Sequence, residues 1–415
     1  MIQIGRDTLL NKKHSIISDI SLNIFSITIT TGIMQLAVYP MISSFVPIGE
    51  FGYILTLMGF VNVISVVVGG SLNNVQLINR TYYLNEEDYY GDFKRLFILG
   101  LFISMVLSLL ILGTNVFNIL LINKLLLLLV ILFTTLRSYL TVYWRIDLNY
   151  RFVLYHSIIT SIGYLVGTYL IKISNPSLWP FAFLCGEIFS AIYLFFKTDF
   201  LKKKLSKSDN FIKIKRDYVN LLSSNIVSNV LIYFDRFILQ GTLGAKEVSI
   251  YFAASVFGKL SSMVLQPVSG VFLSYLSRED KDSKKKYFVL FLSIAFISGV
   301  ILFVVSVIFS PILVRILYSE LFEEAMPFMN LANLSSILLT IGSLFQPVLL
   351  KFTKLYWQNV IQILYAVLFI ILSLFLINKY QLIGFVYASL FSNLFRLLLF
   401  ILVGYFSIWR NKNND

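Results

Sequence analysis

The sequence predicts an all-α integral membrane protein with about 12 transmembrane helices in two six-helix pseudo-repeat halves. Apolar residues make up 58% of the 415 positions, and charged residues make up 13%, about half their usual share of ~25% in a soluble domain. Apolar runs such as residues 288–310 are long enough to cross a hydrocarbon core of roughly 30 Å as a helix. Barrel strands would alternate apolar and polar residues, whereas Leu125 to Phe133 is continuously apolar.

The predicted helices follow these apolar runs in order. In the first half they cover residues 19–40, 51–70, 96–114, 117–136, 153–171 and 179–196. In the second half they cover residues 218–240, 248–274, 288–310, 326–349, 358–377 and 383–407. Each run is expected to be helical because backbone groups in lipid must form their hydrogen bonds within the segment.

The most basic stretch of the chain, from Lys197 to Arg216, lies between the two sets of six helices. This layout is typical of transporters built from repeats. We therefore expect a half at 1–196, a basic cytoplasmic linker at 197–217 and a second half at 218–415. The alternative is an ordinary basic loop that touches anionic lipid.

The distribution of positive charge predicts the orientation. Most of the 34 Lys and Arg lie in alternate loops, which we assign to the cytoplasm together with both termini. The cations expected outside are Lys124, Lys172, Lys246, Arg315 and Lys379. The net charge of +13 is then a consequence of topology, and no nucleic-acid partner is expected.

Polar side chains distinguish interior helices from lipid-facing ones. The runs at 19–40, 51–70, 218–240 and 248–274 carry many amides and hydroxyls, whereas those at 96–114, 117–136 and 288–310 carry few. The first group is expected to line a shared cavity, and the alternative is hydrogen bonding between helices without a cavity. The candidate amides for binding substrate are Gln35, Asn62, Asn225 and Asn229.

Charged residues within the predicted spans are candidates for function. Arg396, Lys259 and Arg236 are the cations, and Glu187 and Asp235 are possible charge partners or ion-coupling groups. One interpretation is that Glu187 pairs with Arg396 or Lys259 and pins two helices together. The other is that a cationic interior binds an anionic substrate.

Several chemistries are not expected. The sequence has no G-x-x-x-x-G-K-[ST] phosphate loop, and its two His and one Cys cannot form the usual zinc site. We predict no cofactor, no metal and no catalytic residue. The predicted outer loops are short, so transport is favoured over an enzyme with an external catalytic segment.

A family resemblance appears at Asp235-Arg236-Phe237-Ile238-Leu239, with further matches downstream at Gly244, Glu247, Tyr251, Ala253, Ala254, Lys259 and Pro267. A second segment is Pro47-Ile48-Gly49-Glu50-Phe51-Gly52-Tyr53. Here the chain resembles polysaccharide flippases of the Wzx type, in the multidrug/oligosaccharidyl-lipid/polysaccharide exporter superfamily. Ser249 stands where that family commonly has glycine.

The resemblance implies export of a polyprenyl-pyrophosphate-linked oligosaccharide across a bacterial plasma membrane, for O-antigen or capsule assembly, by alternating access. Its implied partners are that lipid-linked glycan, membrane lipids, a polysaccharide polymerase and glycosyltransferases. The alternatives are a cation-coupled multidrug exporter of the same superfamily, which would need acidic residues in its cavity, and a membrane polysaccharide polymerase.

Overall fold

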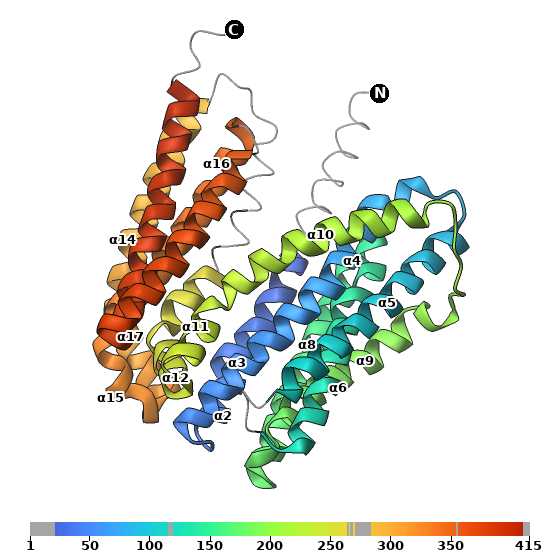
Figure 1. Ribbon diagram of the computed structural model, residues 1–415, viewed down its shortest axis with the longest axis horizontal. Coiled ribbons are helices and arrows are strands. Elements are labelled where there is room, and N and C mark those ends of the chain that lie inside the picture. The colour runs from blue at the N-terminus through green and yellow to red at the C-terminus, as the bar shows by residue number, and fades with distance from the viewer. Residues whose placement is uncertain are drawn as a thin grey trace, which may run out of the picture. The chain divides into compact units, whose positions relative to one another are not determined.

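The computed structural model describes residues 21–114, 119–263, 265, 269, 284–353 and 356–409. Every regular element in these ranges is a helix (Figure 1). Nine helices of the described part have the length and apolar composition needed to cross a membrane. The all-α membrane fold expected from the sequence is thereby confirmed.

The chain forms two compact units, each described here by itself. Unit 1 consists of Met1–Val46 and Tyr53–Asp235, and unit 2 consists of Pro47–Gly52 and Arg236–Asp415. The basic segment 197–217 therefore lies within unit 1. The division into pseudo-repeat halves at that segment stays a prediction.

The described part of unit 1 begins with residues 21–33 in a helix that continues through η1 (Met34–Val38) and α2 (Tyr39–Ser43). Its further elements are α3 (Ile48–Ser65, whose first residues belong to unit 2), η2 (Val66–Gly70), α4 (Ser71–Ile78), η3 (Asn79–Tyr82), α5 (Glu86–Gly113), α6 (Leu121–Leu140), α7 (Val142–Ile146), α8 (Tyr150–Ile173), η4 (Pro176–Leu178), α9 (Pro180–Lys197), η5 (Phe200–Lys202) and α10 (Phe211–Ile232). Asn85 caps α5, because its side chain accepts a hydrogen bond from the Glu87 N–H at 2.9 Å.

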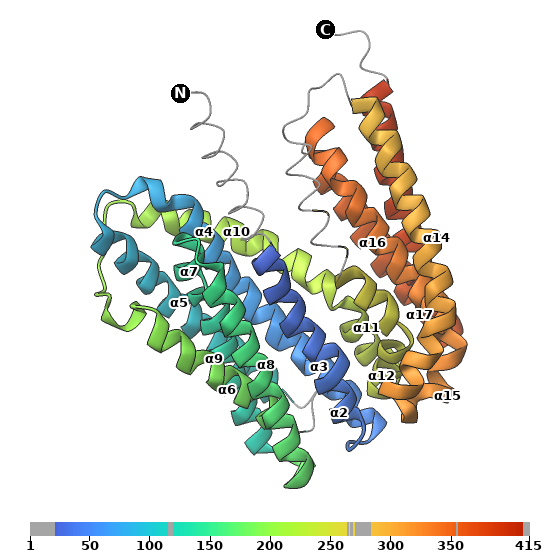
Figure 2. The same cartoon turned by 180° about the vertical axis from the view of Figure 1, so that it is seen from behind.

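Small residues let α8 and α9 approach each other closely. A Cβ added to Gly163 would lie 2.7 Å from the Cα of Gly186, and one added to Gly167 would lie 2.6 Å from the Ala182 carbonyl oxygen. The views in Figures 1 and 2 agree in showing these helices side by side. Such packing is typical of membrane helices, in which van der Waals contact drives association.

Unit 2 contains α11 (Phe234–Thr242, which begins at the junction), α12 (Ala245–Ala254), α14 (Lys284–Leu317), η7 (Ser319–Leu321), α15 (Phe322–Ala325), η8 (Met326–Phe328), α16 (Met329–Phe352) and α17 (Tyr356–Trp409). α17 is two helices in sequence, because Gln381 has φ 53° and ψ −133°. This break lies between the predicted helices at 358–377 and 383–407. A Cβ on Gly384 would lie 2.1 Å from the Leu376 carbonyl oxygen, so only glycine fits beside the break.

Three predicted helices differ from the structure. The run at 248–274 is interrupted, because α12 ends at Ala254 and Ser255 forms a turn. The run at 218–240 is not one helix, because α10 ends at Ile232 and α11 begins at Phe234. The helix predicted at 117–136 extends to Leu140 and therefore includes Arg137, which was expected in a loop. The end of the run predicted at 248–274 lies outside the described residues.

Candidate functional site

Two cations of unit 2 lie over one aromatic ring. The Arg236 guanidinium carbon is 5.4 Å, and the Lys259 Nζ 5.1 Å, from the centroid of the Phe252 ring. Lys259 Nζ is also 5.4 Å from the Tyr251 ring. An aromatic face attracts cations through its quadrupole. The three residues thus gather two positive charges in a small volume, with Arg236 only 6% exposed.

A tight turn brings these residues together. α11 leads into α12 through Gly244, which has φ 113° and whose N–H donates to the Leu239 carbonyl oxygen at 2.9 Å. Glycine adopts this left-handed conformation without the steric penalty that a Cβ brings. The turn places Arg236 of α11 and Phe252 of α12 in contact.

The two segments that carry the family resemblance meet in unit 2. A Cβ on Gly52 would lie 1.7 Å from the Ala245 carbonyl oxygen, so this glycine permits the close approach of the segments. Ser249 Oγ donates to the Ile48 carbonyl oxygen at 2.6 Å. The serine that replaces the commonly found glycine therefore makes a hydrogen bond that ties α12 to the start of α3.

Arg396 is buried in the second helix of α17, at 6% exposure. Its guanidinium carbon is 5.4 Å from the Tyr365 ring centroid and 5.1 Å from that of Phe400. Nη1 donates to the Leu339 carbonyl oxygen at 3.5 Å, while Nε is buried without a hydrogen-bond partner among the described residues. The guanidinium therefore retains a donor for which the described residues supply no acceptor.

A line of polar side chains lies between the surroundings of Arg396 and those of Lys259. Asn393, one helical turn from Arg396, donates through Nδ2 to Ser335 Oγ at 2.9 Å. Ser335 Oγ lies 2.7 Å from Ser389 Oγ, which lies 3.5 Å from the Tyr251 hydroxyl oxygen. Asn393, Ser335, Ser389 and Tyr251 thus form a buried polar stripe in unit 2. Lys259, which is partly buried, contacts the Tyr251 ring at the end of this stripe.

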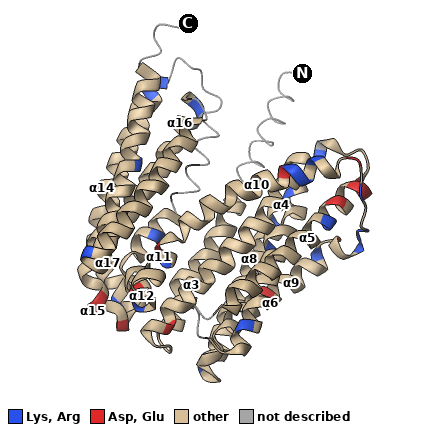
Figure 3. Cartoon of the chain, viewed as in Figure 1, with Lys and Arg blue, Asp and Glu red and all other residues tan. Residues whose placement is uncertain are grey.

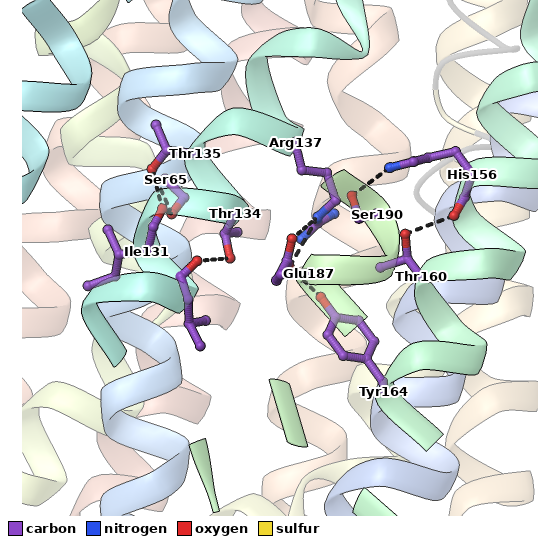
Figure 4. Close-up of polar contacts among 11 residues, drawn as sticks. Ser65, Ile131, Thr134, Thr135, Arg137, His156, Thr160, Tyr164, Glu187 and Ser190 are labelled. Atoms are coloured by element: carbon purple, nitrogen blue, oxygen red, sulfur yellow. Dashed lines mark hydrogen bonds and ion pairs between the residues drawn. The ribbon is translucent and has the colours of Figure 1, made fainter. Parts of the chain in front are cut away.

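Unit 1 contains a separate buried ion pair, shown in Figure 4. Arg137 of α6 donates through Nε to the Glu187 Oε1 and Oε2 atoms at 3.1 and 2.9 Å. The Tyr164 hydroxyl of α8 donates to Oε1 of the same carboxylate. One interpretation of the sequence paired Glu187 with Arg396 or Lys259, whereas its partners in the structure are Arg137 and Tyr164. The signal that could have found the true partner is the position of Arg137, one residue beyond the predicted helix end.

A second polar contact lies beside this ion pair. His156 Nε2 is 2.7 Å from Ser190 Oγ, and Thr160 Oγ1 donates to the His156 carbonyl oxygen at 2.8 Å (Figure 4). The imidazole ring packs against the rings of Trp144 and Tyr193, with centroids 5.4 and 6.1 Å away. Together with the ion pair, these contacts join α6, α8 and α9 through polar groups.

The remaining predicted site residues lie in unit 1. Asn225 Nδ2 donates to Ser71 Oγ at 2.8 Å, and Asn229 Nδ2 donates to the Asn225 carbonyl oxygen at 2.9 Å. Asn62 Nδ2 donates to the Met58 carbonyl oxygen at 2.7 Å. Gln35 lies in η1, and Asp235 is the last residue of unit 1. The predicted set is thus divided between the units, with Arg236, Lys259 and Arg396 in unit 2.

No group of three or more His, Cys, Asp or Glu that could hold a metal ion lies within the described ranges.

Comparisons with known proteins identify solved structures with a similar fold. No family model matches the sequence, and no curated protein matches it. Among solved structures, an inward-facing multidrug resistance MATE family transporter of the MOP superfamily has a TM-score of 0.73 at 11% identity, over 94% of this chain and 96% of that chain. The lipid II flippase MurJ, in an inward closed conformation, has a TM-score of 0.67 at 17% identity, over 94% of this chain and 86% of that chain.

The Vibrio cholerae MATE transporter VcmN has a TM-score of 0.60 at 15% identity, over 96% of this chain and 97% of that chain. These similarities extend over nearly the whole chain. They define the class of fold: this is an all-helical membrane protein with the fold found in MATE transporters and in MurJ. The low identities leave substrate and mechanism to be argued from the residues.

Proposed function

We propose that the chain is a flippase that moves a polyprenyl-pyrophosphate-linked oligosaccharide repeat unit from the inner to the outer leaflet of a bacterial plasma membrane. The product would be used for surface polysaccharide such as O-antigen or capsule. The observation that carries the proposal is the pair Arg236 and Lys259 over the single ring of Phe252. The fold likeness to a protein described as a lipid II flippase supports it.

The chemistry of this substrate suits the residues of unit 2. A pyrophosphate offers several anionic oxygens, for which guanidinium and ammonium groups supply charge-assisted hydrogen bonds. Arg236 and Lys259 would bind it, and Arg396 would supply a further cation. The stripe of Asn393, Ser335 and Ser389 supplies donors and acceptors for sugar hydroxyls.

Asn225, Asn229, Gln35 and Asn62 of unit 1 remain candidates for sugar contacts in this proposal. Alternating access would then expose the site to one leaflet at a time. The proposed setting is a multi-pass protein with both termini in the cytoplasm. Glycosyltransferases would supply the lipid-linked glycan there, and a polysaccharide polymerase would consume it on the outer side.

A cation-coupled multidrug exporter is the second candidate. It is favoured by the TM-score of 0.73 with a multidrug resistance MATE transporter and by the buried carboxylate of Glu187. Coupling requires a carboxylate that can take up and release a cation. Glu187 is held by Arg137 and Tyr164, so we assign this carboxylate to helix packing. Asp235 stays a candidate for ion coupling.

The test is the leaflet on which the lipid-linked repeat unit accumulates. In cells that lack the protein, synthesis should continue and the repeat unit should stay inaccessible to a membrane-impermeant glycan-modifying reagent. The wild-type gene should restore access, and Lys259→Ala should not, while the matched variant Lys172→Ala should. Accessible but unpolymerised repeats would indicate a polymerase instead. Normal access together with lost efflux of a cationic dye would indicate a drug exporter.

A further inference from the structure

The segment that joins α9 to α10 is held against unit 1 at both of its ends. Phe200 and Phe211 are buried in the aromatic core that also contains Phe97, Tyr139 and Tyr218. Their exposures are 7% and 8%. The intervening residues 201–210 therefore form a strap whose position is fixed by burial at each end.

Two charged side chains of α5 hold the strap between these ends. Lys94 Nζ donates to the carbonyl oxygens of Lys203 at 2.6 Å, Phe200 at 3.2 Å and Leu201 at 3.4 Å. Asp92, which is fully buried, accepts hydrogen bonds from the Ser208 N–H at 3.0 Å and the Ser208 hydroxyl at 2.5 Å. Side chains of α5 thus bind backbone carbonyl and amide groups of the strap and hold it in one conformation.

The close fit extends to the N-terminal turns of α5. A Cβ on Gly91 would lie 2.1 Å from Ser206 Oγ, so a larger residue at that position would displace the strap. Lys203 Nζ lies 4.2 Å from the Tyr90 ring centroid, and Lys213 Nζ lies 3.4 Å from that of Tyr82. Figure 3 shows Lys and Arg near this segment and Asp and Glu at the nearby start of α5.

The strap and the first turns of α10 together expose apolar and cationic side chains. Leu201 is 64% exposed, Leu205 54% and Ile212 76%. The exposed cations are Lys202, Lys204, Lys207, Lys213, Lys215 and Arg216. Of these, Lys202 forms an ion pair with Asp199 at 2.9 Å. Side chains of this mixture suit the border of a bilayer, where apolar groups enter the acyl boundary and cations meet phosphate groups.

We propose that the strap is a docking surface for anionic phospholipid headgroups of the leaflet on which it lies, which is the cytoplasmic one by the charge distribution. The position supports this occupant, since the strap connects the end of a membrane span to the next helix and so lies at the bilayer border. Leu201 and Leu205 insert among the lipids, while the exposed Lys204 and Lys207 contact their phosphates. Asp92 and Lys94 preorganise the surface, which lowers the ordering entropy lost on binding.

The test uses the full chain with one fluorescent label. Cys185 is the single native cysteine, so Leu205→Cys in a Cys185→Ala background gives one labelling site. The labelled protein is placed in nanodiscs of mixed phosphatidylglycerol and phosphatidylcholine, with either lipid brominated as the quencher. Brominated phosphatidylglycerol should quench more strongly than brominated phosphatidylcholine.

Lys204→Gln and Lys207→Gln should each reduce that preference by up to about fivefold, the effect of one surface cation on anionic-lipid binding. Lys172→Gln removes the same charge elsewhere in unit 1 and should leave the preference unchanged. Asp92→Asn, which weakens the anchor without removing a strap cation, should lower quenching by both lipids alike.

Equal quenching by the two lipids in the parent protein would overturn the proposal. So would a response of the label to inorganic pyrophosphate in detergent without phospholipid, because the surface would then be a site for soluble phosphates. The readout does not depend on transport, so it can fail while the flippase assignment stands.

Discussion

The Arg137 guanidinium reaches both oxygens of the Glu187 carboxylate through a single nitrogen, Nε, at 3.1 and 2.9 Å. The Arg137 side chain is 24% exposed and that of Glu187 is 2% exposed, so the carboxylate is the more deeply buried partner. A charge in this position is costly unless it is paired and hydrogen-bonded. The pair accordingly joins α6 to α9 at a fixed position.

Removing one partner of this pair should destabilise the protein. We expect Arg137→Leu to lower the free energy of unfolding by about 3–5 kcal/mol, because it leaves the Glu187 carboxylate buried without its cation. The double variant Arg137→Leu with Glu187→Met should recover much of this loss. Thermal unfolding in detergent measures both. A double variant no more stable than the single one would contradict the assignment of Glu187 to packing.

The cations of unit 2 should affect transport rather than insertion. Lys259→Ala and Arg396→Ala should each lower transport by roughly tenfold to a hundredfold, since a hydrogen bond to a charged group contributes about 1.5–3 kcal/mol. Lys259→Arg should retain more activity because it keeps the charge over Phe252. Leaflet accessibility of the lipid-linked glycan is the measurement, with membrane abundance as the control. Unchanged transport in both alanine variants would remove the main support for an anionic substrate.

The glycine contacts between α8 and α9 should be sensitive to size. A Cβ at Gly163 would lie 2.7 Å from the Gly186 Cα, and Gly163→Val adds further side-chain atoms there. We expect this overpacking to lower the free energy of unfolding by roughly 1–3 kcal/mol. Gly113→Ala is the matched control, because a Cβ there meets nothing within 4 Å. Denaturation of the purified variants decides the comparison. Equal stability would mean that the two helices do not pack as tightly as described.

The orientation can be tested with reporter fusions. A reporter active only outside the cytoplasm should be silent when fused at Ser206 and active near Glu320, because positive loops are retained on the cytoplasmic side. The result matters for the strap, since anionic lipids there must belong to the cytoplasmic leaflet. Activity at Ser206 would reverse the assigned topology.

The positions of the spans could be predicted because apolar length and the need to satisfy backbone hydrogen bonds leave little choice. The break at Tyr233, where α10 ends, could not be predicted, because residues 218–240 contain no proline or glycine. α6 shows the same limit. The apolar run at 117–136 indicated a lipid-facing helix, yet α6 continues to Leu140 and includes Arg137.

Charged positions in the second half were visible in the sequence, and three of them are buried or partly buried cations over aromatic rings in unit 2. Their ring partners were not predicted. Phe252 is one of 38 phenylalanines, and no local pattern distinguishes the ring that accepts two cations from those that face lipid. Only the turn at Gly244 brings α11 and α12 together around it.

The sequence by itself determined that this protein is a bundle of membrane-crossing helices, because runs of apolar residues must satisfy their backbone hydrogen bonds internally in lipid. It also indicated some of the charges inside the bundle, Glu187 and Arg396 among them, but not Arg137. Which groups meet was decided by the tertiary structure alone. Glu187 pairs with Arg137 because close glycine contacts hold α8 beside α9, and α6 packs against the same helix. Such contacts depend on how helices interlock, which the spacing of charges along the chain does not specify.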